Sequence, residues 1–203
     1  MKQEIVIATK NKDKYLEIRL ILKSLPYQLI FAGNDHHLPD IQETGDSLYQ
    51  NALLKAKTTA NILRKSCIAD DTGFFVQALH GEPGIYAARY AGNNCSYEDN
   101  VQKLLQEMKG ITDRRAFFST VALFYDPVTE TIIHQEGTVY GQIINEHRGK
   151  SGFGYDPIFI PQGHLLTYAE IPEAEKNLIS HRYLAFHSLA KLLVKYNFQK
   201  SSG

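Results

Sequence analysis

The stretch Cys67-Ile68-Ala69-Asp70-Asp71-Thr72-Gly73 constrains the fold more than any other part of the sequence. Its apolar first half is typical of a buried strand that ends in two adjacent carboxylates. If the strand continues through Asp70, the side chains of Asp70 and Asp71 point to opposite sides of a sheet. Buried carboxylates cost free energy unless they are paired or hold a metal ion, which favours a functional site here. Gly73 is expected to mark a sharp change of direction, although these residue types would also suit a solvated turn.

The composition is that of an ordinary globular protein, with 203 residues of which 43% are hydrophobic and 22% are charged. That length suits one large domain or two smaller lobes. A formal net charge of +0 predicts no nucleic-acid partner and no membrane partner. The two cysteines, Cys67 and Cys95, form no CxxC pair, which argues against a zinc site and a disulfide scaffold. No apolar run reaches transmembrane length and the first residues are too charged for a signal peptide, so we expect a cytoplasmic protein.

The N-terminal residues predict a strand, a polar loop and a helix in that order. Residues 5–8 form a compact apolar run, and apolar side chains recur at helical spacing over residues 15–25. A loop that joins a strand to a helix presents backbone N–H groups and the helix dipole to an anion. In this loop Thr9 and Asn11 can add hydrogen bonds, and Lys14 adds positive charge. The loop lacks the glycines of a P-loop, and a plain surface loop with solvated lysines is the alternative interpretation.

The segment Glu43-Thr44-Gly45 precedes a second predicted helix. Asp46 or Ser47 can cap that helix, and an apolar face recurs over residues 48–63. Glu43 lies just before the helix start, where a carboxylate interacts favourably with the helix dipole. The same position would let Glu43 bind a metal ion from a rigid loop, and both interpretations stay open.

The second half of the chain predicts further strands and helices with polar ends. Ser96 and Asp99 resemble a capping box at the start of a helix. The pattern over residues 116–144 predicts an antiparallel meander. An aromatic, glycine-rich loop at 152–157 follows and leads into another strand. Ser180 is expected to cap the last helix.

Polar groups of three kinds gather at the predicted ends of these elements. They are carboxylates at Glu43, Asp70, Asp71 and Asp156, cations at Lys14, Lys55, Lys176 and Arg182, and rings at Phe153 and Tyr155. Carboxylates suggest Mg²⁺, which takes one or two of them together with water and phosphate oxygens. Cations suggest a polyphosphate, and an aromatic ring beside glycines suggests a stacked base. Together they predict a nucleoside triphosphate site, where water attacks directly because the sequence shows no nucleophile motif.

Seven blocks of this chain, in the same order, resemble the inosine triphosphate pyrophosphatase family. They are ATKNKDK (8–14), ETG (43–45), NALLKA (51–56), ADDTG (69–73), PGIYAARY (83–90), GFGYDP (152–157) and EKNLISHR (175–182). The resemblance covers almost the whole chain. Any single block is a weak signal, whereas seven blocks in family order are highly specific.

The resemblance implies an α/β fold with an elongated mixed β-sheet flanked by helices, in two lobes around a central cleft. It implies a homodimer and fits a single domain over residues 1–199. The composition of residues 200–203 separately predicts an unstructured tail. The implied reaction converts a nucleoside triphosphate and water into the monophosphate and pyrophosphate, with Mg²⁺ as cofactor. The implied substrates are ITP, dITP and XTP.

On this basis we hypothesise a role for each polar group. Glu43 and Asp71 bind Mg²⁺, Asp71 also orients and deprotonates the attacking water, and Asp70 tunes Asp71. The residues expected to bind the substrate are Thr9, Lys10, Asn11, Lys12, Asp13, Lys14, Lys55, Thr72, Phe153, Gly154, Tyr155, Asp156, Lys176, His181 and Arg182. Among them the lysines neutralise the triphosphate, Phe153 or Tyr155 stacks on the base, and Arg182 or His181 donates to its 6-oxo group.

Three alternatives stand beside this hypothesis. Phe153 and Tyr155 suit a hydrophobic core as well as a base site. A pyrophosphatase of the Maf type, acting on other modified nucleotides, and a nucleotide-binding module without turnover are the rival functions. The chain also departs from the family pattern at Gln42 and Gln50, where Glu is common, which bears on how it binds the metal ion.

Overall fold

The computed structural model describes the backbone of residues 3–201 and the side chains of residues 3–196. Its contacts divide the chain into two compact units. Unit 1 consists of Met1–Asp71, Thr120–Gly137 and Arg182–Gly203, and unit 2 consists of Thr72–Ser119 and Thr138–His181. Each unit therefore combines segments that are distant in the sequence.

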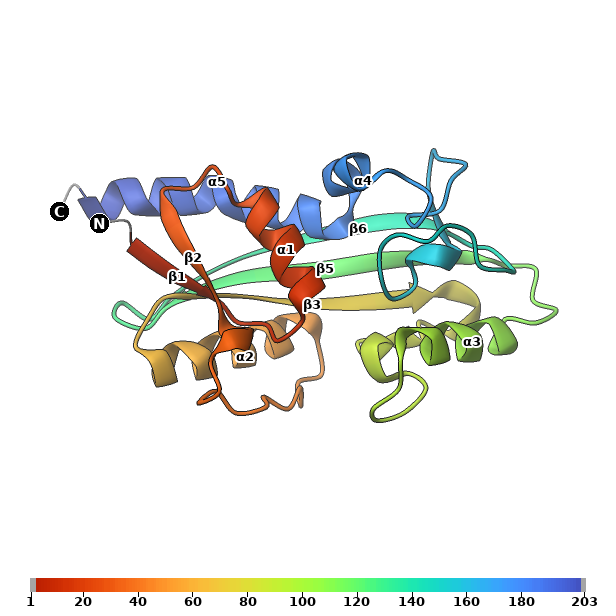
Figure 1. Cartoon of the computed structure of the whole chain (residues 1–203), viewed down its shortest axis with the longest axis horizontal. Helices are drawn as coiled ribbons and strands as arrows, with labels where there is room; N and C mark the ends of the chain where they lie inside the picture. Colours follow the sequence, from red (N-terminus) through yellow and green to blue (C-terminus); the bar gives the residue numbers. More distant parts are fainter. Residues whose placement is uncertain (1–2, 202–203) are drawn as a thin grey trace. The chain divides into compact units, whose positions relative to one another are not determined.

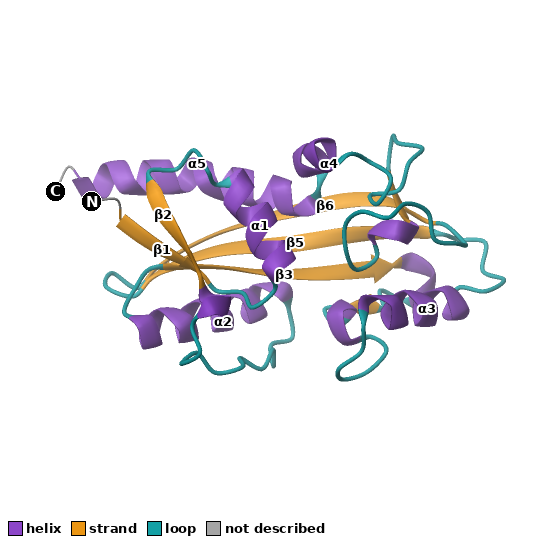
Figure 2. Cartoon of the chain, viewed as in Figure 1, coloured by secondary structure: helices purple, strands orange, loops and turns teal. Residues whose placement is uncertain are grey.

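The described residues contain a seven-stranded sheet, which Figures 1 and 2 show among the helices. Its strands are β1 (Gln3–Ile7), β2 (Tyr27–Phe31), β3 (Cys67–Val76), β4 (Pro83–Gly84), β5 (Arg115–Asp126), β6 (Thr131–Ile143) and β7 (Phe159–Pro161). The order is β2-β1-β3-β5-β6-β7, and β4 pairs with β3 outside that path. β1 is parallel to β2 and β3, whereas β4 and β7 are antiparallel to β3 and β6. The mixed sheet predicted from the resemblance is confirmed.

Unit 1 has helices on both faces of its strands. They are α1 (Lys12–Ile21), α2 (Leu48–Leu63) and α5 (His181–Ser201). Figure 1 shows α1 and α5 over one face and α2 over the other. Apolar residues of β1, α1 and α5 form one buried cluster that includes Ile5, Ile18 and Phe186. On the opposite face α2 buries the small side chains of Ala52 and Ala56 completely, which lets the helix approach the sheet closely.

Unit 2 is built around an aromatic core. Phe74 of β3, Phe118 of β5 and Phe159 of β7 are buried in one cluster with Tyr155 and Tyr168. Helix α3 (Tyr97–Glu107) and the short helix α4 (Glu173–Ile179) also belong to this unit. The capping box predicted for the start of α3 is confirmed. Figure 2 shows long loops between β6 and α4.

Gly73 does not turn the chain, so the predicted change of direction is wrong. β3 continues through Gly73 as far as Val76. A Cβ at Gly73 would lie 3.0 Å from the carbonyl oxygen of Gly84 in β4 and 2.5 Å from the ring of Phe75. The glycine is therefore required by the close approach of a neighbouring strand and ring, which a single-strand pattern does not reveal.

Helix boundaries differ from the predictions at three places. α1 begins at Lys12, inside the expected loop, because the side chain of Asn11 caps it. Helix α4 occupies a stretch for which no helix was predicted. Ser180, the expected cap of the last helix, is the extended residue between α4 and the start of α5. α5 continues through Ser201, because neither Gly nor Pro interrupts it, so Lys200 and Ser201 are helical and not in a tail. Residues 202–203 of the expected tail lie outside the described residues.

Within residues 3–201, none of the helices combines the length and the hydropathy that crossing a membrane requires. The cytoplasmic location and the central cleft stay predictions.

Candidate active site

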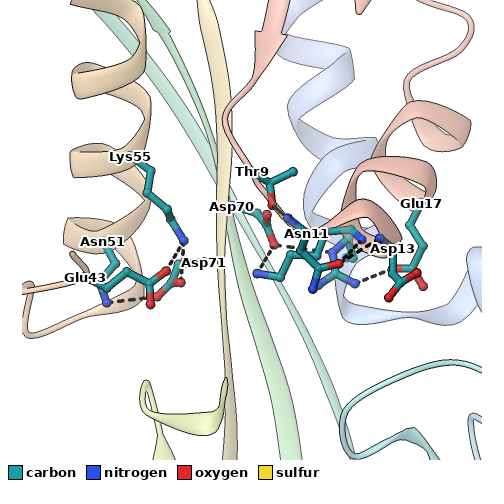
Figure 3. A network of polar contacts seen from close by, with 11 residues as sticks. Thr9, Asn11, Asp13, Glu17, Glu43, Asn51, Lys55, Asp70 and Asp71 are labelled. Carbon is teal, nitrogen blue, oxygen red and sulfur yellow. Dashed lines mark hydrogen bonds and ion pairs between the residues drawn. The ribbon is translucent and has the colours of Figure 1, made fainter. Parts of the chain in front are cut away.

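Asp70 and Asp71 point to opposite sides of β3, as the strand period predicts (Figure 3). Asp71 faces α2, where its carboxylate contacts Lys55. Asp70 faces α1 and α5, where it contacts Lys14 and Arg182. Only 2% of Asp70 and 3% of Asp71 is exposed, so each carboxylate depends on these partners.

The Asp71 cluster contains two carboxylates and one ammonium group. Lys55 donates to Asp71 over 2.9 Å and to Glu43 over 2.6 Å. Asn51, one helical turn before Lys55, donates to the other oxygen of Asp71 over 3.2 Å. The charges of Glu43, Lys55 and Asp71 leave one net negative charge in a largely buried place.

Asn51 also holds the loop that carries Glu43. Its amide oxygen accepts a hydrogen bond of 2.8 Å from the backbone N–H of Gly45. A Cβ at Gly45 would lie 2.8 Å from that oxygen, so glycine is needed for the contact. Ser47 caps α2 as predicted, and Gln50 accepts from the backbone of Asp46. Asn51 was not among the predicted site residues, although it opens one of the family blocks.

The Asp70 cluster contains equal numbers of acids and bases. Lys14 Nζ lies 3.2 Å from Asp70 Oδ2, and Arg182 Nε lies 3.6 Å from the same oxygen. Arg182 also donates to Glu17 of α1 through Nη1. Because Arg182 is only 2% exposed, its guanidinium is committed to two acids inside unit 1. Glu17 is a second site residue that the motif analysis missed, since its partner is 165 positions away.

The two clusters shift the pKa values of their carboxylates in opposite directions. Burial alone would raise the pKa of Asp70, but the charges of Lys14 and Arg182 outweigh it and hold that pKa below its ordinary value. Burial raises the pKa of Asp71, and the charge of Glu43 adds to the increase that Lys55 partly offsets. Burial would lower the pKa of Lys55, yet its two carboxylate neighbours raise it, so the ammonium keeps its proton.

The start of α1 is an ordered helix cap and not a loose loop. Asn11 Oδ1 accepts from the backbone N–H groups of Asp13 and Lys14 over 2.9 and 3.2 Å. Thr9 Oγ1 accepts from the backbone of Asn11 over 3.1 Å. Lys10, in contrast, is exposed and lies 3.4 Å from Asp40. The structure therefore brings the cap and Lys14 to Asp70, and leaves Lys10 outside this cluster.

The remaining members of the α1 segment differ from Lys14 in exposure. Lys12 and Asp13 are exposed in the first helical turn, whereas Lys14 is half-buried. An exposed lysine at a helix N-terminus adds little fixed charge to a buried site. Their predicted contacts with substrate stay predictions.

In unit 2, Asp156 fixes both Lys176 and the loop that carries Phe153. Lys176, which is only 5% exposed, donates to Asp156 Oδ2 over 2.7 Å. The backbone N–H of Phe153 donates to the same oxygen over 2.9 Å. A Cβ at Gly152 would lie 2.2 Å from this carboxylate oxygen, so the motif needs glycine there. The ammonium of Lys176 lies 5.2 Å from the centre of the half-buried Phe153 ring, a cation–π contact.

Tyr155 is a core residue, so its predicted stacking on a base is wrong. Its ring is 4% exposed and stacks on Phe74 with centres 4.8 Å apart. Its hydroxyl donates to the carbonyl oxygen of Ala87 over 2.9 Å. The alternative interpretation of a core aromatic is the correct one for Tyr155, which leaves Phe153 as the ring with an accessible surface.

The other predicted residues of unit 2 have mixed environments. His181 is 4% exposed, and its ring stacks on Phe118 with centres 4.5 Å apart. Gly154 has a φ of +63°, which an L residue rarely adopts, and both Gly154 and Thr72 are partly exposed. Thr72 is the β3 residue after Asp71 and belongs to unit 2.

The donor set around Glu43 and Asp71 fits a hard divalent cation. Both carboxylates point toward the ammonium of Lys55, whose Nζ lies 2.6 Å from Glu43 Oε1 and 2.9 Å from Asp71 Oδ1. No group of three His, Cys, Asp or Glu with metal-ligand geometry exists among the described residues. Mg²⁺ needs only one or two carboxylates, because water and substrate phosphates complete its six ligands. Two carboxylates such as Glu43 and Asp71 would be enough for the protein's share of such a site, and their role as ligands stays a prediction.

The mixed sheet and the acid–lysine clusters on β3 define an α/β protein suited to a polyphosphate and its metal ion. Comparison with known proteins specifies the family. The model of the Ham1 family matches residues 5–192, and this chain belongs to that family. The resemblance predicted from the seven blocks is thereby confirmed.

Curated relatives align with nearly the whole chain. A dITP/XTP pyrophosphatase from Thermoanaerobacter sp. (strain X514) is 41% identical over 194 residues, which cover 95% of this chain and 97% of that protein. A dITP/XTP pyrophosphatase from Staphylococcus aureus (strain MW2) is 43% identical over 193 residues, which cover 94% and 96%.

Solved structures agree with the fold. The Ham1 protein of Staphylococcus aureus superposes with a TM-score of 0.85 at 41% identity, over 96% of this chain and 100% of that chain. A HAM1 protein from Coxiella burnetii gives a TM-score of 0.87 at 36% identity, over 95% and 99% of the two chains. The predicted fold class is therefore confirmed.

Proposed function

We propose that this chain hydrolyses the non-standard purine nucleoside triphosphates dITP, XTP and ITP to the monophosphate and pyrophosphate. Membership of the Ham1 family and relatives named dITP/XTP pyrophosphatases support this activity. The observation in the molecule that carries it is the Asp71 cluster. There the buried carboxylate of Asp71 and the half-buried carboxylate of Glu43 share one lysine, which leaves an excess of negative charge beside a helix whose Asn51 supplies an amide contact.

Mg²⁺ is the cofactor that these donors suit, with Glu43 and Asp71 as its protein ligands. When bound, Mg²⁺ supplies positive charge that stabilises the phosphate oxygens and the leaving pyrophosphate. Lys55 adds a second positive charge, because its raised pKa keeps the amine protonated throughout the neutral range. The net negative charge of the cluster favours binding of a cation over binding of a free anion.

Asp71 is the residue that accepts a proton from the attacking water. Lys55 and Asn51 hold its two oxygens in fixed positions, so the carboxylate does not reorient during the reaction. Its raised pKa makes it a stronger base than an ordinary aspartate. Asp70, held by Lys14 and Arg182 on the other side of β3, positions Asp71 through the strand backbone. Lys14 and the capped N-terminus of α1 offer positive charge to the phosphate chain.

Selection of the base follows from the donors beside Phe153. Hypoxanthine and xanthine carry a 6-oxo acceptor, whereas adenine carries a 6-amino donor. The ammonium of Lys176, which Asp156 holds beside Phe153, can donate to a 6-oxo acceptor and not to a 6-amino donor, and such mismatches can discriminate by up to ~10⁴-fold. Guanine shares the 6-oxo group, so this contact separates the substrates from ATP and not from GTP. The side chains of Arg182 and His181 are buried in contacts with other residues. Hydrogen bonds from these two side chains to the base stay a prediction.

Release of pyrophosphate from a panel of triphosphates tests the proposed function. The panel contains ITP, dITP, XTP, GTP, ATP, UTP and dTTP, each with Mg²⁺ and with a chelator. We expect turnover of ITP, dITP and XTP that requires Mg²⁺ and exceeds turnover of ATP. Preference for UTP or dTTP would favour a Maf-type activity, and binding of ITP without release of pyrophosphate would indicate a module without turnover.

The family resemblance also supports a homodimer as the working form. Unit 2 exposes large apolar side chains at Leu165 and Leu166, which are 87% and 45% accessible. Exposed apolar side chains of this size gain free energy when a second copy covers them. Light scattering coupled to size-exclusion chromatography should give twice the mass of one chain, and the mass of a single chain would exclude the dimer.

A further inference from the structure

Tyr97 stands at a fixed point at the start of α3. The side chain of Ser96 accepts from the backbone of Asp99 over 3.1 Å, and Asp99 accepts from the backbone of Ser96 over 2.7 Å. Val101 and Leu104 of the same helix are buried in the unit 2 core. The first residue of α3 is therefore held by a complete capping box and a buried helix face.

The ring of Tyr97 contacts the ring of Phe153. Their centres are 5.8 Å apart and their planes differ by 35°. Tyr97 keeps 42% of its surface exposed. Tyr97 lies outside the seven blocks quoted above.

The Phe153 loop is held to Asp156 by its backbone. The N–H of Phe153 donates to Oδ2 of Asp156, the N–H of Asp156 donates to the carbonyl oxygen of Phe153, and Lys176 approaches the Phe153 ring. Gly152 and Gly154, on either side, both have positive φ values. Glycines leave the backbone free to adopt other conformations, so the direction of the Phe153 ring depends on its side-chain neighbours.

The distance between the two rings defines what Tyr97 can do. A base inserted between two rings would need them about 7 Å apart, twice the optimal separation of carbon atoms. At 5.8 Å with tilted planes, Tyr97 and Phe153 are in contact with each other and leave no room for a base between them. Tyr97 therefore acts on a base only through Phe153.

We propose that Tyr97 is a positioning residue for nucleotide binding, which holds the ring of Phe153 in the orientation on which the purine base stacks. The inference rests on the proposed function, in which Phe153 supplies the stacking surface. Stacking does not depend on the substituents of the base, because every base has a flat face. Tyr97 thus contributes equally to all purine substrates, whereas the choice among them depends on other donors.

Steady-state kinetics of three variants test this inference. In Tyr97→Ala, KM for ITP should rise roughly three- to tenfold, as expected for loss of one aromatic pair, with kcat unchanged. The ratio of kcat/KM for ITP over ATP should stay as in the unmodified chain. Tyr97→Phe keeps the ring and should restore KM. Tyr140→Ala removes another exposed tyrosine of unit 2 that pairs with a phenylalanine, Phe117, and should leave KM unchanged.

Product inhibition separates positioning from a general loss of structure. Inhibition by IMP requires the base, so its inhibition constant should rise in Tyr97→Ala by the same factor as KM. Inhibition by pyrophosphate does not involve the base and should be unchanged. An unchanged KM, an equal loss of pyrophosphate inhibition, or a failure of Tyr97→Phe to restore KM would each overturn the inference.

Calorimetric binding of IMP distinguishes failure of the inference from failure of the proposed function. If the unmodified chain does not release pyrophosphate from ITP, the proposed function fails, and the comparison of IMP affinity between the unmodified chain and Tyr97→Ala still decides the role of Tyr97. Weaker IMP binding in the variant supports the inference. Equal binding, or no binding to either chain, contradicts it.

Discussion

The two sides of β3 carry the same residue type in adjacent positions but use it differently. On the α1 side, Asp70 and Glu17 face Lys14 and Arg182, and the charges balance. On the α2 side, Asp71 and Glu43 share the single ammonium of Lys55. In a balanced buried network the loss of any one partner leaves an uncompensated charge and is costly, whereas an acid excess is suited to a divalent cation. The number of cationic partners, and not the residue type, therefore distinguishes the two aspartates, and our proposal assigns the chemistry to Asp71.

The pKa directions follow from the same count. Two cations hold the pKa of Asp70 down against the effect of burial. One cation shared with Glu43 does not achieve this for Asp71, whose pKa is raised. Asp70 is therefore held ionised at neutral pH, and Asp71 is the carboxylate to which our proposal assigns the proton of the attacking water.

The largest expected difference between the two sides is catalytic. Asp71→Asn keeps the size of the side chain but removes the proton acceptor and a metal ligand, so kcat for ITP should fall by about 10²–10⁴-fold. The thermal unfolding temperature should change little, because Lys55 keeps Glu43 as its partner. Pyrophosphate release and circular dichroism provide the two measurements. Near-normal turnover would show that Asp71 is not the base.

The opposite pattern is expected on the other side of the strand. Asp70→Asn leaves the buried guanidinium of Arg182 with Glu17 alone, and breaking a buried ion pair of this kind costs ~3 kcal/mol of unfolding free energy. Urea unfolding of Asp70→Asn and Asp71→Asn under one buffer measures the contrast. Equal losses of stability in the two variants would contradict the division of roles.

Acid unfolding sharpens the contrast. The pKa of Asp70 is lower in the folded chain than in the unfolded chain, so its contribution to stability is present above about pH 4 and is lost as the pH falls below that. Asp70→Asn should therefore lose less stability than the unmodified chain between pH 5 and about pH 3. Urea midpoints across this range provide the measurement, and parallel curves for both chains would exclude a charged, paired Asp70.

Removing the acid excess should weaken the response to Mg²⁺. Glu43→Gln makes the Asp71 cluster neutral, like the Asp70 cluster, and removes one oxygen anion from the donor set. The Mg²⁺ concentration for half-maximal activity should rise by about tenfold, because affinity depends on the charge of the ligands. The matched control is Glu4→Gln, which removes an acid paired with Lys65 at the surface. An equal effect of both changes would remove Glu43 from the metal site.

The smallest expected effect is that of labelling the cysteines, since Cys67 is buried at the start of β3. Burial raises the pKa of Cys67 to about 12, so at pH 8 almost none of its thiol is ionised. Cys95 is half-buried. Iodoacetamide at pH 8 should therefore label Cys95 first and Cys67 only after unfolding, with little loss of activity. Mass spectrometry of the peptides gives the order, and rapid labelling of Cys67 would show that the strand start is open.

Local patterns predicted much of the fold correctly, and their failures have a common cause. The caps at Ser47 and Ser96 were identified because a cap depends on residues within three positions. The roles of Gly73 and Tyr155 were misjudged because each depends on a distant partner, Gly84 in one case and Phe74 in the other. Single-sequence patterns contain no information about which distant residues approach.

The candidate site shows the same division. The motif blocks contained Glu43, Lys55 and both aspartates, since those residue types at strand and helix ends already suggest a metal and phosphates. Glu17 and Asn51 were missed, because nothing near them in the sequence shows that one binds Arg182 and the other binds Asp71.

The amino-acid sequence alone established the strand with two acids, the family and the kind of substrate. The strand period depends only on adjacent residues, and the motif blocks can be recognised in order along the chain. Only the folded chain shows that Asp70 has two cations and Asp71 shares one, since Lys14, Lys55 and Arg182 reach β3 from three different helices. The number of neighbouring cations is decisive because both carboxylates are buried. Water no longer stabilises their charges, so only the adjacent side chains can do so.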